Sequence, residues 1–349
     1  MVQLLFLAGS LLSGLLLAIG PAPHPEWHRE PTLTRQESVR PPADSFAARA
    51  DVQRFIRTMA AEHGLPVNDL NRWFGEIDTR EDIIRLISRP AEKTLSWGEY
   101  REIFLDQPRI DNGAAFWARH RDTLQRAEAV YGVPPRVVVA ILGVETRYGK
   151  VTGRHGVLEA LATLAFDYPP RADFFRRELE AFLLLAREEN IDPLTPRGSY
   201  AGAMGLAQFM PSSYRAYAVD FDDDGQRDIW GNPVDAIGSI ANYLHEHRWR
   251  RGAPVTAPVE VVGEGFRQHL SRGLNPPTVD VARLRQDGAR PVRPVDGDQE
   301  AFLLEMITAG GAEYWLGFYN FYVITRYNRS PLYAMAVHQL GEAIDDHVR

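Results

Sequence analysis

A single carboxylate lies in a strongly apolar segment of the chain. Residues 135–148 read PRVVVAILGVETRY, and Glu145 is the acidic residue among them. This composition predicts a helix that is buried on almost all sides. Burial disfavours the ionised carboxyl and raises its pKa, and a carboxyl that keeps its proton near neutral pH can act as a general acid. An ion pair with Arg147 is the alternative, and the segment alone leaves both open.

A second acidic group has the spacing of a metal-binding loop. Residues 220–228 read DFDDDGQRD, which places aspartates at positions 1, 3 and 5 of an EF-hand calcium loop and Gly225 at position 6. Position 12, where a bidentate glutamate normally closes the site, is Gly231. The match is therefore partial, and a solvated acidic turn is the alternative to a calcium site.

Neither the composition nor the motifs of the chain support other common kinds of catalytic or binding site. The chain has no cysteine, which excludes disulfides, thiolate metal sites and cysteine nucleophiles. Its histidines lack metal-ligand spacing, and neither a phosphate-binding glycine loop nor a Gly-x-Ser-x-Gly motif is present. A net charge of -7 argues against a nucleic-acid-binding protein, because such a protein presents a basic face to the phosphates.

The first residues form an uncharged apolar run. Residues 4–19 read LLFLAGSLLSGLLLAI, and prolines follow directly. Because about 20 residues are needed to span a bilayer, we predict that residues 1–22 are a signal peptide or a short anchor. The absence of cysteine excludes lipid attachment as a lipoprotein. The proline-rich stretch 23–43 is predicted to be a linker.

The whole chain of 349 residues is long enough for about two domains. Apolar residues recur at helical spacing from residue 44 onward, and residues 171–190 and 330–345 predict amphipathic helices. Residues 252–298 are rich in Pro, Gly and Val, which predicts a small β-containing insertion. Helical or mixed character is expected to return at residues 302–307.

Five separated motifs support one family resemblance. They are EKTLSWGEYR from Glu92, GVETRYG from Gly143, YAGAMGLAQFMPSSY from Tyr200, DIWGNPVDAIGSIANYL from Asp228 and FYVITRYNRSPLYAMAV from Phe321. Together they resemble the lytic murein transglycosylase B family over roughly residues 44 to 347. Several ordered motifs are far more specific than one short pattern.

This resemblance implies a mainly α (α+β) fold. It implies a goose-lysozyme-like helical core, a helical accessory domain and a small β-containing domain around a peptidoglycan groove. The expected divisions are a helical accessory domain at 44–130, a catalytic core with the calcium loop at 131–251, the β insertion at 252–300 and a return to the core at 301–349. Whether the accessory domain shares helices with the core is left open.

The resemblance also implies the chemistry. It assigns catalysis to Glu145, with cleavage of the β-1,4 bond between N-acetylmuramic acid and N-acetylglucosamine and formation of a 1,6-anhydromuramoyl end. Most glycosidases use two carboxylates, and no obvious second one accompanies Glu145 in these motifs. A single glutamate acting first as acid and then as base fits this inventory. A hydrolytic muramidase and a non-catalytic peptidoglycan-binding module are the alternatives.

Several groove residues follow from the same resemblance. Tyr168–Arg171 reads YPPR, where the family has a pair of arginines, so one arginine remains and binding there is expected to be weaker. The substrate-binding residues implied are Ser199, Gln208, Phe209, Met210, Tyr243, Tyr327, Tyr333 and Arg171.

The family also implies how the acidic loop is completed. A later aspartate on the next helix, Asp235, replaces the missing glutamate. The calcium ligands implied are Asp220, Asp222, Asp224, the Gln226 carbonyl and Asp235. The expected role of calcium is structural, with sodium as an alternative occupant, and no organic cofactor is expected.

The expected location is the periplasm, reached by export, with the N-terminal segment either cleaved or retained as an anchor. The partner implied is the peptidoglycan glycan strand, with cell-wall synthesis proteins as a further class that the sequence leaves undecided. Contact with the inner membrane is expected only through the N-terminal segment, and the protein is expected to be a monomer.

Overall fold

The computed structural model describes residues 45–88, 95–271 and 273–349. The predicted signal segment (1–22) and linker (23–43) lie outside the described residues, as do residues 92–94 of the EKTLSWGEYR motif. The chain divides into two compact units, with the boundary between Asp78 and Thr79.

The smaller unit is a set of short helices with its own apolar core. Helix α1 ends where Gly64 takes a left-handed conformation with φ of 66°, a position that suits glycine. Ile56, Leu70 and Phe74 are fully buried. The elements are η1 (Phe46–Ala48), α1 (Ala50–His63) and α2 (Val67–Gly75).

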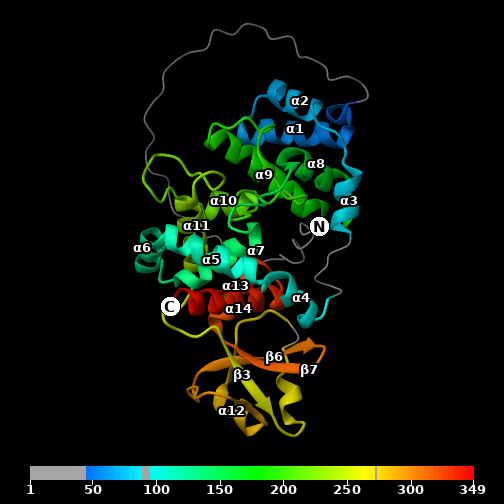
Figure 1. Cartoon of the computed structure of the whole chain (residues 1–349). Helices are drawn as coiled ribbons and strands as arrows, with labels where there is room; N and C mark the ends of the chain where they lie inside the picture. Colours follow the sequence, from blue (N-terminus) through cyan, green and yellow to red (C-terminus); the bar gives the residue numbers. More distant parts are fainter. Residues whose placement is uncertain (1–44, 89–94, 272) are drawn as a thin grey trace. The chain divides into compact units, whose positions relative to one another are not determined.

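The larger unit is mainly helical, which confirms the predicted fold class (Figure 1). Its first helices are α3 (Glu81–Ile87), α4 (Trp97–Phe104), α5 (Gln107–Arg119), α6 (Arg121–Tyr131) and α7 (Pro135–Thr146). The next are α8 (Val157–Asp167), η3 (Pro169–Arg171), α9 (Ala172–Glu188), α10 (Pro211–Tyr217) and α11 (Pro233–Glu246). The last are η4 (Gly265–His269), α12 (Val281–Gln286), α13 (Tyr319–Tyr327) and α14 (Pro331–Val348).

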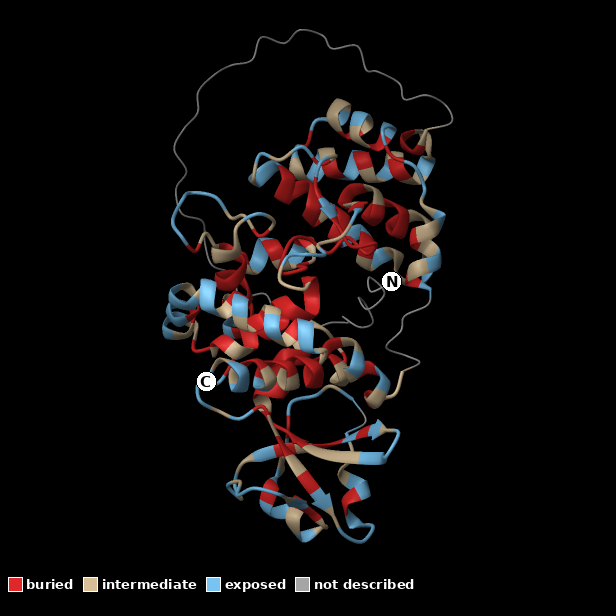
Figure 2. Cartoon of the chain, in the orientation of Figure 1, coloured by how far each residue is buried: buried red, intermediate tan, exposed pale blue. Residues whose placement is uncertain are grey.

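Helix α7 is the central helix of this unit. Every residue of α7 except Arg136 is buried, as its sequence predicts, and Figure 2 colours it accordingly. α14, α5, α6 and α11 all pack against it. In the described parts of the chain, no single helix has both the length and the hydropathy of a membrane span. The pair α6 and α7 meets these two criteria together, with a bend of 114° between them.

An antiparallel sheet follows α11 in the chain. Its order is β4-β6-β7-β3-β5, and it packs around buried Leu303, Leu316 and Phe266. The expected helical or mixed character of residues 302–307 is wrong, because they lie in β6 and pair in register with β7. The strands are β3 (Thr256–Val261), β4 (Val279–Asp280), β5 (Ala289–Pro291), β6 (Glu300–Thr308) and β7 (Gly311–Gly317), and β1 (His155–Gly156) and β2 (Arg197–Gly198) form a separate pair.

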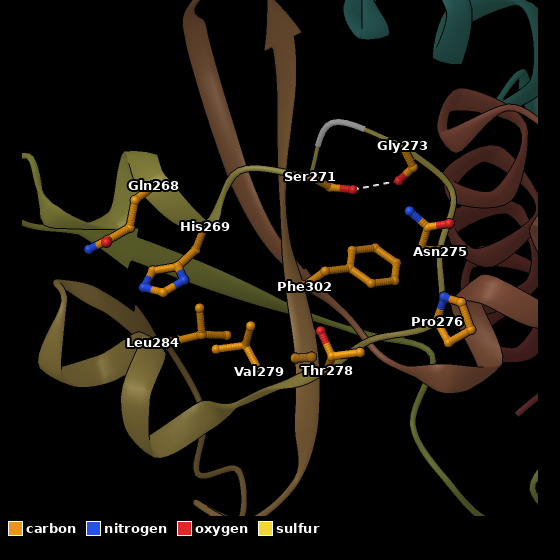
Figure 3. A pocket seen from close by; sticks show the side chains of 11 residues that line it. Gln268, His269, Ser271, Gly273, Asn275, Pro276, Thr278, Val279, Leu284 and Phe302 are labelled. Atoms are coloured by element: carbon orange, nitrogen blue, oxygen red, sulfur yellow. Dashed lines mark hydrogen bonds between the residues drawn. The ribbon is translucent and has the colours of Figure 1, made fainter.

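The sheet region also holds a pocket of about 330 Å³ (Figure 3). Phe302, Val279 and Leu284 give it an apolar floor, and Thr278 and His269 add polar groups. His269 Nε2 is also within 2.6 Å of a carboxylate oxygen of Asp287. None of these residues belongs to the five sequence motifs.

The half-buried imidazole of His338 on α14 makes the stability of the fold depend on pH. Burial, and next the charge of Arg136, lower its pKa from 6.5 to about 4. As the pH falls below 6.5, the unfolded chain takes up this proton before the folded one, so stability is lost between about 6.5 and 4, by roughly 1–3 kcal/mol. We expect His338→Gln to flatten the dependence of the urea midpoint on pH in this interval. Equal slopes for the variant and the parent protein would contradict this assignment.

Candidate active site

Glu145 lies in the last turn of α7 and is 7% exposed. Its Oε1 accepts a hydrogen bond of 2.6 Å from the hydroxyl of Tyr333 on α14. Burial, and then the charge of Glu145, hold the pKa of Tyr333 well above its usual range. The hydroxyl therefore keeps its proton and acts as the donor, and this donor stabilises the ionised form of the carboxylate.

Aromatic rings extend from Tyr333 in one contiguous row. The ring centroids of Tyr327 and Tyr333 are 6.4 Å apart, and those of Tyr243 and Tyr327 are 4.8 Å apart. Phe209 contacts both Tyr243 and Tyr327. The hydroxyl of Tyr327 donates to the Ala207 carbonyl at 2.6 Å, and that of Tyr243 donates to the Arg326 carbonyl at 2.5 Å. Both hydroxyls are therefore engaged, so these two residues could contact a sugar only through ring surface. For Tyr243 that surface is small, because the residue is 7% exposed and its ring stacks on His247.

The loop of small residues between β2 and α10 is held close to its neighbours. A Cβ on Gly202 would lie 2.4 Å from the side chain of Leu161, and one on Gly205 would lie 2.5 Å from the Ile229 carbonyl. Both glycines also have positive φ. Glycine is therefore required at these positions by space and by backbone conformation.

Ser199 and Gln208 stand at the two ends of this loop. The Ser199 hydroxyl accepts hydrogen bonds from the N–H groups of Ala201 and Ala203. The Gln208 amide nitrogen donates to the carbonyls of Thr152 and Gly205, at 3.0 and 2.8 Å. Its Oε1 is then the atom through which this side chain can accept a further hydrogen bond.

The two other predicted substrate residues lie on neighbouring segments. Met210 is the N-cap residue of α10 and directly follows Phe209. Arg171 ends η3, where its guanidinium lies 4.2 Å from the ring centroid of Phe174, and burial lowers its pKa. The structure thus joins Glu145 to the aromatic row through Tyr333, whereas the contacts that place Arg171 are with the rings of α9.

Sequence reasoning missed a buried carboxylate that supports the loop. Glu178 on α9 accepts hydrogen bonds from the backbone N–H and the hydroxyl of Ser212, at 3.0 and 2.7 Å, and so ties α9 to the start of α10. Burial raises the pKa of Glu178. The sequence could have predicted that Glu178 is buried, because Glu178 lies on the same helical face as the apolar residues Phe175 and Phe182.

The acidic loop brings carboxylates together as its spacing predicts. Oxygen atoms of Asp220, Asp222 and Asp235 lie within 4.8 Å of one another. Asp235 is fully buried, and its two oxygens accept the N–H groups of Phe221 and Asp228, at 2.7 and 2.8 Å. Burial first, and then the charges of Asp222 and Asp220, raise the pKa of Asp235. Converging carboxylates with a buried member are the donor set that a hard cation such as calcium prefers.

The other two predicted ligands also lie in this loop. The Asp224 carboxylate accepts the backbone N–H of Gln226 at 2.8 Å. Asp223 and Gly225 have φ of 61° and 90°, so the chain turns tightly at this point. The turn brings the start of the loop back toward Asp235 on α11.

The family model for the transglycosylase SLT domain matches residues 47–342. The chain is 43% identical over 321 residues to membrane-bound lytic murein transglycosylase B of Escherichia coli strain K12, covering 89% of this chain and 87% of that protein.

Solved structures of lytic transglycosylases are also similar to this chain in sequence and in fold. Soluble lytic transglycosylase SltB1 from Pseudomonas aeruginosa is 49% identical, with a TM-score of 0.80 over 85% of this chain and 99% of that chain. Lytic transglycosylase Slt35 of Escherichia coli in complex with calcium is 42% identical, with a TM-score of 0.82 over 91% and 99%. SltB3 from Pseudomonas aeruginosa in complex with NAG-NAM-pentapeptide is 32% identical, with a TM-score of 0.76 over 88% and 81%. The chain therefore belongs to the transglycosylase SLT family.

Proposed function

We propose that this protein is a lytic transglycosylase that cleaves the β-1,4 bond between N-acetylmuramic acid and N-acetylglucosamine of peptidoglycan. The product is a chain end with a 1,6-anhydromuramoyl ring. The observation that carries the proposal is the buried Glu145 at the end of α7, with Tyr333 as its hydrogen-bond donor, in a chain of this family.

Glu145 acts twice in the proposed reaction. The protonated carboxyl first donates its proton to the glycosidic oxygen as the bond from that oxygen to C1 breaks. The acetamido oxygen of the same sugar supports the electron-poor C1. Glu145, now ionised, then removes the proton of the C6 hydroxyl, and the C6 oxygen forms a bond to C1. Glu145 ends the cycle protonated, and no water is consumed.

Tyr333 fits this cycle because it donates to Glu145 at 2.6 Å. Its hydroxyl stabilises the ionised carboxylate between the two proton transfers, when the negative charge is otherwise buried. No obvious second carboxylate accompanies Glu145 in the family motifs, whereas most glycosidases use two. This supports the proposal that the attacking oxygen comes from the substrate itself.

Substrate contact is proposed for the residues that the family motifs identify. Ser199 and Gln208 are suited to polar contacts with acetamido and hydroxyl groups. Ring faces and apolar side chains suit the C–H faces of the sugars. The residues proposed for these contacts are Ser199, Gln208, Phe209, Met210, Tyr243, Tyr327, Tyr333 and Arg171.

Calcium is proposed as the ion of the acidic loop, with Asp220, Asp222, Asp224, the Gln226 carbonyl and Asp235 as ligands. The convergence of three carboxylates supports this, and Slt35 has been solved in complex with calcium. When bound, the ion supplies a positive charge that joins the loop to α11. Its proposed role is structural, because Tyr243 of the aromatic row lies on α11.

The organisation and location of the protein are also proposals. We retain an accessory domain within residues 44–130, which shares α5 and α6 with the core because both pack against α7, and a lysozyme-like core that contains residues 131–251. The β insertion begins at residue 252 and ends at about Gly317 rather than at 300, because β6 and β7 belong to its sheet. We place the protein in the periplasm as a monomer, exported by residues 1–22. A membrane-bound relative supports a location in the cell envelope.

The products of digestion test the proposed function. We expect purified peptidoglycan treated with the protein to release fragments whose muramoyl end is lighter by one water than a hydrolysed end, as measured by mass spectrometry. Fragments with a reducing end would identify a hydrolytic muramidase instead. Binding without any cleavage would identify a non-catalytic module.

A further inference from the structure

The three residues that follow the catalytic helix all have a left-handed backbone. Arg147, Tyr148 and Gly149 have φ of 51°, 60° and 87°. The left-handed region costs roughly 1–2 kcal/mol for each residue that carries a Cβ, and glycine occupies one of the three positions. This turn lies two residues beyond Glu145, so the contacts that hold it also determine how α7 ends.

Backbone hydrogen bonds account for part of the turn. The N–H groups of Arg147 and Tyr148 donate to the carbonyls of Gly143 and Leu142, at 3.2 and 3.0 Å, which closes the last turn of α7. The hydroxyl of Thr146 accepts the N–H of Gly149 at 3.0 Å. The same hydroxyl lies 3.2 Å from the Leu206 carbonyl, which it approaches as a donor, so the helix end is also tied to the small-residue loop.

The side chain of Tyr148 also holds this turn, through contacts with α5 and α7. Its hydroxyl donates to the Arg109 carbonyl on α5 at 2.9 Å, and its ring stacks on Phe116 at 5.7 Å. A Cβ on Gly143 of α7 would lie 2.4 Å from this hydroxyl, and a Cβ on Gly113 of α5 would lie 2.6 Å from it. The two glycines thus form a notch between α5 and α7 that accepts the end of the tyrosine.

Tyr148 and the catalytic carboxyl contact different sides of α7. Successive helical residues are about 100° apart, so the positions of Gly143 and Glu145 differ by about 200° around the axis. Tyr148 therefore packs on one side of the helix end while Glu145 meets Tyr333 on the other. A displacement of Tyr148 would rotate or shift the last turn and move Glu145 relative to Tyr333.

We propose that Tyr148, seated in the notch of Gly113 and Gly143, is a positioning residue for Glu145. The left-handed turn that it anchors sets the distance between the Glu145 carboxyl and the glycosidic oxygen. This inference rests on the proposed function, because it assumes that Glu145 performs the proton transfers. It assigns Tyr148 no contact with the substrate.

Gly143→Ala tests this role, because the added methyl group displaces Tyr148 while alanine favours the helix by about 1 kcal/mol over glycine. On soluble peptidoglycan strands we expect kcat to fall about 100-fold, as for a misplacement of about 1 Å, with KM within about twofold of the parent. A crystal structure of the variant should show the Glu145 Oε1 to Tyr333 Oη distance lengthened beyond hydrogen-bonding range. Gly75→Ala is the matched control, because its methyl group would contact nothing within 4 Å.

Tyr148→Phe keeps the test decisive if Gly143→Ala does not fold. It removes the hydroxyl that donates to the Arg109 carbonyl but keeps the ring that stacks on Phe116, so we expect a smaller loss of kcat, about 5- to 10-fold. The double variant should be more active than Gly143→Ala wherever both fold. A folded Gly143→Ala or Tyr148→Phe variant with the parent kcat and an unchanged Glu145–Tyr333 distance overturns the proposal, as does an equal loss in Gly75→Ala.

The distance between Glu145 Oε1 and Tyr333 Oη in the variant tests this inference independently of the proposed function. If the parent protein yields reducing ends, the proposed transglycosylase chemistry fails. The ratio of variant to parent kcat and the position of Glu145 would still decide whether Tyr148 positions the carboxyl.

Discussion

Glu145→Gln should abolish cleavage of peptidoglycan while leaving folding and glycan binding intact. Glutamine has the shape of glutamate, and its carbonyl oxygen can still accept the hydrogen bond from Tyr333. An amide can neither donate the proton to the leaving oxygen nor remove one from the C6 hydroxyl. Because general acid and base catalysis contribute about 10²- to 10⁴-fold each, we expect turnover to fall by about 10⁴-fold or more.

Turnover is measured on soluble glycan strands, and binding by co-sedimentation with purified murein. Glu159→Gln is a suitable control, because Glu159 forms an ion pair of 2.8 Å with Arg80 rather than a contact with Tyr333. This control should retain the parent turnover. Substantial activity in Glu145→Gln would show that a different group transfers the proton.

Asp235→Asn should remove the stabilisation that calcium confers. Asp235 is the buried member of the carboxylate group, and its two oxygens already accept the N–H groups of Phe221 and Asp228. A ligand at 100 times its Kd stabilises the folded state by about 2.7 kcal/mol. Chelation of calcium with EGTA should therefore lower the free energy of unfolding of the parent protein by roughly 2–3 kcal/mol and leave that of Asp235→Asn unchanged.

Asp223→Asn provides the matched control for this site. Asp223 lies in the same loop at φ of 61°, which asparagine tolerates, and it is outside the group of converging carboxylates. Thermal unfolding with and without EGTA should show the parent calcium response in this variant. A parent protein whose melting temperature and glycan cleavage do not respond to EGTA would refute the structural role of calcium.

The local pattern of apolar residues in the sequence was sufficient to predict the central helix of the fold. The apolar composition of residues 135–148 predicted a buried helix, and α7 is buried along almost its whole length. Residues 302–307 show where local pattern fails. They read FLLEMI, and a short apolar run of this kind is compatible with a buried strand as well as with a helix. Pairing with β7 decides in favour of a strand, and that pairing is a property of the folded chain.

The same distinction holds at the acidic loop and at the end of α7. Alternate aspartates converge because a tight turn brings neighbouring residues together, so sequence spacing could predict them. The notch that receives Tyr148 needs Gly113 and Gly143 from two different helices. No spacing within one segment signals such a contact, because it depends on how α5 packs against α7.

The sequence by itself determined that this protein is mainly helical, that Glu145 is the candidate acid and that residues 220–228 resemble a calcium loop. Each of these conclusions depends on residues that are close together in the sequence or on motifs that can be recognised in the sequence without a structure. Only the tertiary structure decided that Tyr333, 188 residues away, donates to Glu145, and that Tyr148 holds the opposite side of the same helix end. The physical reason is that hydrogen bonds and packing act over a few ångströms in space, and folding alone brings such distant residues within that range.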